Sequence, residues 1–121
     1  LSHSEQNAIM RYLLDLAAYE ELYVGGRNYL LVHGGLGRFS ADKPLSAYDL
    51  NELVWTRPDH NVPWTDDPDC YMVVGHTPTQ LISGKAEIFW KNQYIFIDCG
   101  ACMEGGVLAC LCLDTMKAFY V

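Results

Sequence analysis

The 121 residues are enough for one domain with a modest core, and half of them are hydrophobic while 19% are charged. The formal net charge of −7 argues against a protein that binds duplex nucleic acid, because such a protein needs a basic face to neutralise phosphates. No apolar run approaches the roughly 20 residues that span a bilayer, so we expect no membrane partner.

The N-terminal segment, residues 4–22, has the pattern of one long amphipathic helix. Ser4 can cap its start, and Gly25-Gly26 would end the segment. Apolar residues recur at three- and four-residue steps and predict a buried stripe, formed by Ile9, Leu13, Leu16 and Ala17. We expect this helix to cover one face of a sheet.

The rest of the chain is rich in segments with strand character. Residues 34–69 are mostly loop, with one or two helical turns over 46–54. The apolar runs that predict strands are residues 28–33, 70–74, 87–90, 94–97, 107–113 and 117–121. The sequence therefore predicts a sheet-rich α/β domain with one long N-terminal helix.

Two histidines stand where a predicted strand ends and the chain turns. Residues 30–36 read LLVHGGL, and residues 72–78 read MVVGHTP. In each, an apolar run ends near a histidine beside glycine or proline, which places an imidazole at the rim of a sheet. Neutral imidazole binds Zn, Mn and Fe. We therefore predict that His33 and His76 share one metal ion.

The five cysteines leave two readings open. An odd count, mostly within apolar stretches, favours free buried thiols and a reducing cytoplasm over a secreted disulfide scaffold. The alternative is a structural zinc site, although its spacing is poor. Its ligands would be Cys99, Cys102, Cys110 and Cys112.

Four further segments, in this order, resemble a known family. Residues 53–57 read LVWTR, 73–79 read VVGHTPT, 97–101 read IDCGA and 105–109 read GGVLA. With LLVHGGL before them, they resemble the calcineurin-like metallophosphoesterases, which include serine/threonine phosphoprotein phosphatases and bacterial diadenosine tetraphosphate hydrolases. The resemblance covers roughly residues 29–121. It implies the C-terminal half of an α-β-β-α sandwich.

The resemblance also implies roles for single residues. His33 and His76 would be ligands of one ion in a centre of two divalent metals (Mn, Fe or Zn). Arg57 would bind the phosphate of a phosphorylated small molecule or phosphoprotein, with a surface salt bridge as the alternative. Asp98 could be a ligand, but the family pattern makes it structural, fixing backbone N–H groups of the turn. His60 could line the opening of the same site, but we favour a loop histidine without a role in the site.

The family's other metal motifs, Asp-x-His, Gly-Asp-x-x-Asp and Gly-Asn-His-Glu, do not occur in the chain. We therefore interpret residues 1–121 as a single partial domain that binds metal weakly or not at all and hydrolyses little. Surface meant for the other half should cause self-association through an exposed sheet edge or apolar face. The alternative is a non-enzymatic module with a cysteine zinc site or a binding role.

Overall fold

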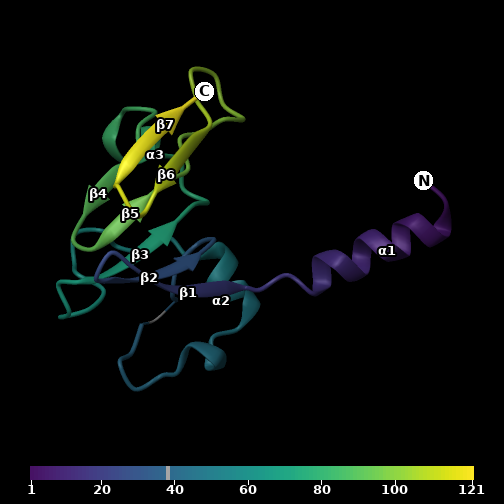
Figure 1. The fold of residues 1–121 in the computed structure, drawn as a ribbon, viewed down its shortest axis with the longest axis horizontal. Helices are drawn as coiled ribbons and strands as arrows, with labels where there is room; N and C mark the ends of the chain where they lie inside the picture. The colour runs from purple at the N-terminus through teal and green to yellow at the C-terminus, as the bar shows by residue number, and fades with distance from the viewer. Residues whose placement is uncertain (38) are drawn as a thin grey trace.

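The computed structural model of the chain describes residues 1–37 and 39–121 and shows a mixed α/β fold around one five-stranded sheet (Figure 1). The strand order is β1-β2-β3-β5-β4, in which β2, β3 and β5 are parallel and the two edge strands are antiparallel. The α/β class predicted from the sequence is confirmed. The strands are β1 (Tyr19–Val24), β2 (Arg27–Val32), β3 (Cys70–Val74), β4 (Phe89–Lys91) and β5 (Tyr94–Phe96).

The N-terminal helix is shorter than the sequence predicts. Helix α1 (His3–Leu14) has 12 residues, and Ser2 rather than Ser4 caps it in a reciprocal capping box with Glu5. Residues 19–24 form strand β1 instead of a further helical turn. Gly25-Gly26, expected to end a helix, forms the two-residue turn of the β1–β2 hairpin. Both glycines have positive φ (59° and 84°), as a type I′ turn requires.

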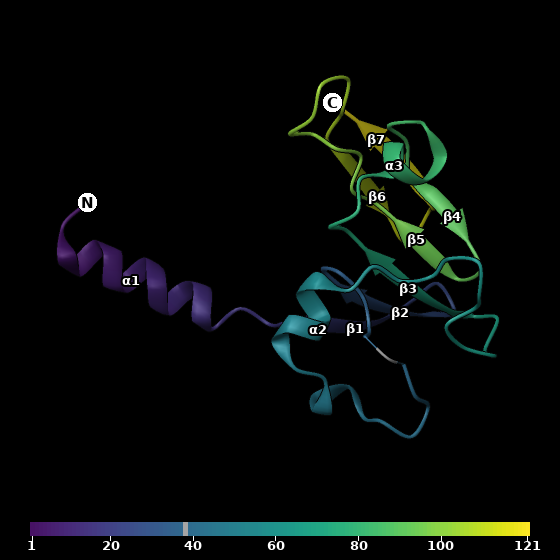
Figure 2. The same cartoon turned by 180° about the vertical axis from the view of Figure 1, so that it is seen from behind.

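Helix α1 covers no face of the sheet. It extends away from the strands in both opposed views (Figures 1 and 2), and none of its residues is buried. The predicted buried stripe is therefore wrong: Ile9, Leu13 and Leu16 are about half exposed and Ala17 is exposed too. The apolar stripe exists, but the described residues offer it no surface to pack against.

The remaining elements largely follow the sequence pattern. Strand β3 has the predicted bounds, and a second two-stranded sheet forms from β6 (Ala109–Cys112) and β7 (Lys117–Tyr120). The predicted helical turns are η1 (Leu45–Ala47) and α2 (Leu50–Trp55). Helix α3 (Thr79–Ser83), directly after the second histidine, was not expected.

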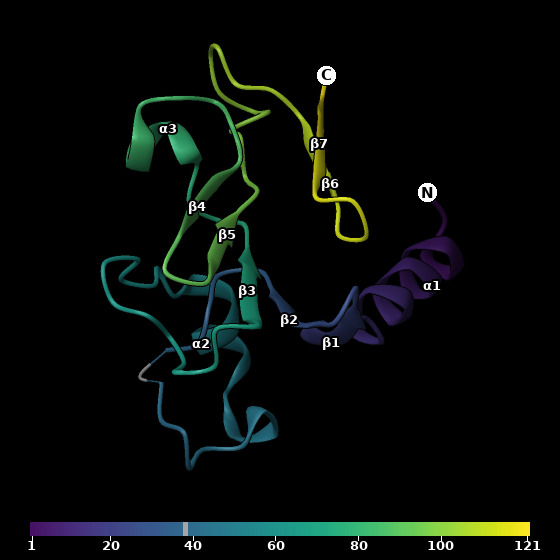
Figure 3. The ribbon, with the colours of Figure 1, turned by 60° about the vertical axis from the view of Figure 1, so that its left-hand side comes forward.

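Apolar side chains form one packed cluster on each face of the main sheet. On one face, Leu30, Val74 and Phe96 pack with Leu53 of α2. On the other face, Val73 and neighbouring strand residues pack against the β6–β7 hairpin, which stands apart from α2 in Figure 3. Among the described residues, no helix combines the length and apolar character needed to cross a bilayer.

The chain leaves β2 in close contact with the carboxyl end of α2. The Gly34 N–H donates to the Leu53 carbonyl at 2.8 Å. A Cβ atom at Gly34 would lie 2.6 Å from the Val54 carbonyl oxygen, which is closer than real Cβ contacts come. Only glycine lets α2 approach the end of β2 so closely.

We predict that Gly34→Ala destabilises the fold by about 1–3 kcal/mol, because the added methyl overlaps backbone that cannot move aside cheaply. Gly75→Ala is the matched control, since its Cβ would meet nothing nearer than 3.5 Å. Urea denaturation of both variants measures the difference in the free energy of unfolding. Equal losses at the two glycines would contradict this account of Gly34.

Candidate functional site

The two predicted histidines lie side by side at one rim of the sheet. His33 follows β2 directly, and His76 stands one residue beyond Gly75, which follows β3. Because β2 and β3 are parallel with Val32 opposite Val74, both strands end at the same level. The Gly75 N–H donates to the His33 carbonyl at 2.9 Å, and the imidazole centres are 5.2 Å apart. Ligand sites of open α/β sheets occur at this carboxyl edge.

His76 has an unusual backbone conformation. Its φ is +61°, and the Thr77 N–H donates to the Gly75 carbonyl at 2.6 Å, which closes a γ-turn around the histidine. The positive-φ form of this turn is rare and costs a non-glycine residue on the order of 1–3 kcal/mol. Such strain persists where the surrounding structure fixes it, which happens most often at functional sites.

The distance between the two ring centres is compatible with one shared cation. Two imidazoles that bind an ion at about 2.1 Å and a near-tetrahedral angle have ring centres about 5 Å apart, close to the 5.2 Å observed. Within residues 1–37 and 39–121, no group of three or more histidine, cysteine or acidic side chains is placed to hold a metal. The pair therefore offers two ligands, and the cysteines of the alternative zinc site form no such group.

Burial and neighbouring charges lower the pKa of His76. Desolvation is the largest cause, the positive charges of Arg57 and His33 add to it, and Asp98 opposes it. The folded chain thus favours neutral His76, the form that can bind a metal. Since an unfolded histidine takes up its proton first, this residue destabilises the fold as the pH falls below the ordinary histidine pKa.

Arg57 follows α2 in the chain. It stands two residues beyond the end of that helix, is exposed, and lines a cavity of about 270 Å³ together with Trp64 and Tyr94. Neither histidine lines this cavity, and Arg57 is linked to the pair through the contribution of its charge to the lowered pKa of His76. The described residues show no ion pair for Arg57, so its alternative assignment to a salt bridge gains no support.

Asp98 fixes the turn after β5. Its carboxylate accepts the Gly100 N–H at 2.9 Å, and its carbonyl accepts the Thr79 N–H at 2.8 Å. The first bond is the structural role that the family resemblance implied, and it is confirmed. The second ties the start of α3 to β5.

Two aromatic contacts complete the surroundings. His60 packs edge-on against Phe89 and Phe96, at 5.8 Å from each ring centre, which agrees with a loop histidine held by packing. Trp55 lies in the family-like segment LVWTR, but no role in the site was predicted for it. Its ring lies 5.4 Å from that of His76 and nearly perpendicular to it. The sequence does not predict this contact, because it depends on where α2 ends.

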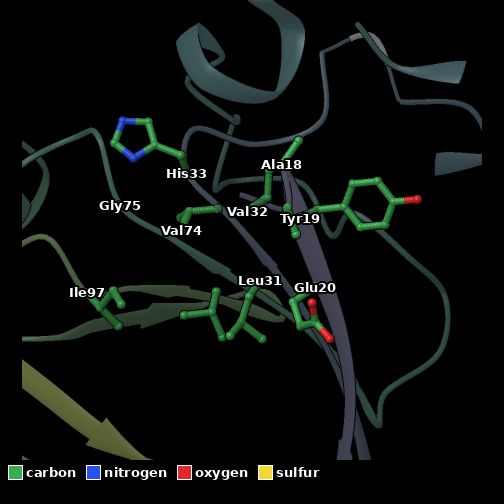
Figure 4. A pocket seen from close by; sticks show the side chains of 11 residues that line it. Ala18, Tyr19, Glu20, Leu31, Val32, His33, Val74, Gly75 and Ile97 are labelled. Atoms are coloured by element: carbon green, nitrogen blue, oxygen red, sulfur yellow. The ribbon is translucent and has the colours of Figure 1, made fainter. Parts of the chain in front are cut away.

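An apolar hollow adjoins His33. Its volume is about 390 Å³, and Leu31, Val73 and Ile97 form part of its lining, close to the junction of α1 and β1 at Ala17 and Ala18. Figure 4 shows His33 at the rim, with its ring directed away from Leu31 and Ile97. The site thus lies next to the edge of the sheet face on which the β6–β7 hairpin packs, since Val73, Leu31 and Ile97 belong to that apolar cluster.

Comparison with protein-family models and with curated proteins gave no match to this sequence.

We predict that Arg57→Gln raises the pKa of His76 and Asp98→Asn lowers it further, because the first change removes a repelling charge and the second an attracting one. NMR titration of the imidazole protons measures both shifts. Arg27→Gln is the control, since Arg27 starts β2 at the opposite end of the strand and lies over the Tyr71 ring. Unchanged titration in the two site variants would place these charges too far from His76 to matter.

Proposed function

We propose that this chain is the C-terminal half of a metal-dependent phosphoester hydrolase of the calcineurin-like type, similar to serine/threonine phosphatases. The observation that carries the proposal is the pairing of His33 with His76 at the carboxyl edge of parallel strands, at a spacing suited to one shared cation. The strained turn at His76 and the bond between Asp98 and Gly100 support it.

Each residue of the site has a definite task in this proposal. His33 and His76 hold one of two divalent ions (Mn, Fe or Zn), and the bound ions supply Lewis-acid activation of the phosphoryl group and the attacking water. Arg57 offers a planar fork to two phosphate oxygens. Gly34 lets α2 approach, which brings Arg57 toward the histidines.

The proposed substrate class follows from the family resemblance. Three exposed acidic residues, Asp66, Asp67 and Asp69, lie in the loop before β3, at the end of that strand opposite His76, so their charge does not select the substrate. We propose phosphorylated small molecules or phosphoproteins as substrates. The five cysteines, all within the described part of the chain, are free thiols, which supports a cytoplasmic setting, but the predicted burial is wrong for most of them, since only Cys99 is buried.

Two imidazoles leave the metal centre short of ligands. Structural and catalytic sites for first-row metals use three or four protein ligands. We therefore propose that a segment carrying further ligands, carboxylates above all, completes the site. Without that segment the 121 residues bind metal weakly and hydrolyse little.

A metal titration tests the pair itself. We expect the chain to bind Zn²⁺ or Co²⁺ weakly, with His33→Ala and His76→Ala each losing most of the affinity, because each change leaves a single ligand. His60→Ala is the matched control: a histidine of the same chain that packs against Phe89 and Phe96. Isothermal titration calorimetry measures the affinities. Binding that survives the loss of either His33 or His76 would refute the shared site.

An activity assay tests the ligand shortage. After chelation and return of Mn²⁺, we expect the 121-residue chain to hydrolyse p-nitrophenyl phosphate at close to the background rate. Robust turnover would show that these residues complete a metal centre by themselves, and the half-site proposal would be abandoned.

We propose further that this chain associates with a second copy of itself through α1. Exposed apolar residues of α1, among them Met10, Leu13 and Leu14, have no packing partner in the described chain. Helix α1 leads directly into the hollow beside His33 through Ala17 and Ala18. Association through the exposed edge of β1 in each copy is less favourable, because Glu20 and Glu21 would face the same acidic residues of the second copy.

Light scattering over a range of concentrations tests this association. Leu13→Glu should raise the dissociation constant about tenfold or more, since burial of one leucine contributes about 1.5–3 kcal/mol. Gln6→Glu is the control, because it adds the same charge to the same helix at a polar position. A chain that stays monomeric at high concentration, or equal effects of both variants, would count against α1 as the interface.

A further inference from the structure

The His76 ring has one enclosed nitrogen with no hydrogen-bond partner. Its Nε2 atom has almost no solvent-accessible surface and contacts no donor or acceptor of the described chain. A ligand cannot reach this nitrogen, so a cation can bind His76 only through Nδ1. Histidines that bind metals usually donate their second ring N–H to a carboxylate or carbonyl, which fixes the tautomer. Nothing of that kind faces Nε2.

The Trp55 ring lies against the His76 imidazole. The indole and imidazole centres are 5.4 Å apart and the rings are nearly perpendicular, at 85°, so the edge of one ring meets the face of the other. The face of an indole carries negative charge and accepts N–H donors. It repels a nitrogen lone pair for the same reason.

Packing of the core does not explain this tryptophan. Its side chain is 66% exposed at the end of α2, although the same helix buries Leu53 at 2%. Trp55 instead stands beside a residue with a strained backbone. The position of α2 is itself fixed by the bond from the Gly34 N–H to the Leu53 carbonyl. The ring of Trp55 is therefore held next to His76 by the same contact that orders the rim.

We propose that Trp55 is a positioning residue for His76: its indole face accepts the Nε2–H of the imidazole and leaves the Nδ1 lone pair for a cation. This role rests on the proposed function, because it takes His76 as a metal ligand. It fixes both the orientation of the ring and its neutral tautomer. His33, on another side of the same ring, remains free to share the ion.

The tautomer can be measured without any metal. Long-range ¹H–¹⁵N spectra of the 121-residue chain, at a pH where the imidazoles are neutral, distinguish Nε2–H from Nδ1–H at each histidine. We expect His76 to be in the Nε2–H form. Trp55→Leu should convert it to a mixture of tautomers, whereas Trp55→Phe should keep the Nε2–H form because an aromatic face remains. Tyr23→Leu is the control, an equally exposed aromatic residue on β1.

A Zn²⁺ titration gives the second readout. Trp55→Leu should weaken binding about tenfold, the lower end of what loss of such partners costs, while Trp55→Phe and Tyr23→Leu should change it little. Amide spectra identify any variant that fails to fold, in which case the tautomer of His76 in the original chain decides. His76 in the Nδ1–H form, or the same tautomer with and without an aromatic ring at 55, would overturn the proposal. That result would leave zinc binding by His33 and His76 intact, so the two proposals fail separately.

Discussion

The parallel pairing of β2 with β3 is the constraint on which the site depends. Its register places Val32 opposite Val74, and the bond from the Gly75 N–H to the His33 carbonyl continues the ladder one residue beyond the strands. The chain therefore turns away from the sheet at the same level after β2 and after β3, and the two histidines lie side by side. A slip of one residue would send side chains to the opposite face of the sheet and separate the imidazoles.

A second constraint brings the remaining chemistry to the same rim. Helix α2 lies in the crossover between β2 and β3, and its Leu53 carbonyl accepts the N–H groups of both Gly34 and Gly35. This contact works only because Gly34 has no side chain. It explains why Trp55 and Arg57, more than 20 residues from His33 in the sequence, act on the same pair of imidazoles.

The sequence predicted the parts of this fold whose signal is local. Strand β3 is a pure apolar run that ends at a glycine, and its bounds were predicted correctly. Strand β1 was missed because its residues continue the helical pattern of α1 without an interruption, although the Gly-Gly pair after Val24 is a known hairpin signal. The place of α1 was not predictable, since an amphipathic stripe shows that a helix needs a partner but not where that partner is. The approach of Trp55 to His76 likewise depends on tertiary contacts alone.

The proposed incomplete ligand set and the hollow beside His33 are connected physically. The hollow lined by Leu31, Val73 and Ile97 has His33 at its rim, so a segment that fills the hollow also ends beside the proposed metal ligands. Burial of apolar surface contributes about 25 cal/mol per Å². The free energy of this packing can hold a carboxylate of the segment close to a cation, so that cation binding does not have to supply the free energy of docking. Packing and metal affinity should therefore rise together when such a segment docks. A second copy's α1 can supply the packing, but its one carboxylate, Glu5, already accepts hydrogen bonds from Ser2, which is why association of this chain with itself need not produce activity.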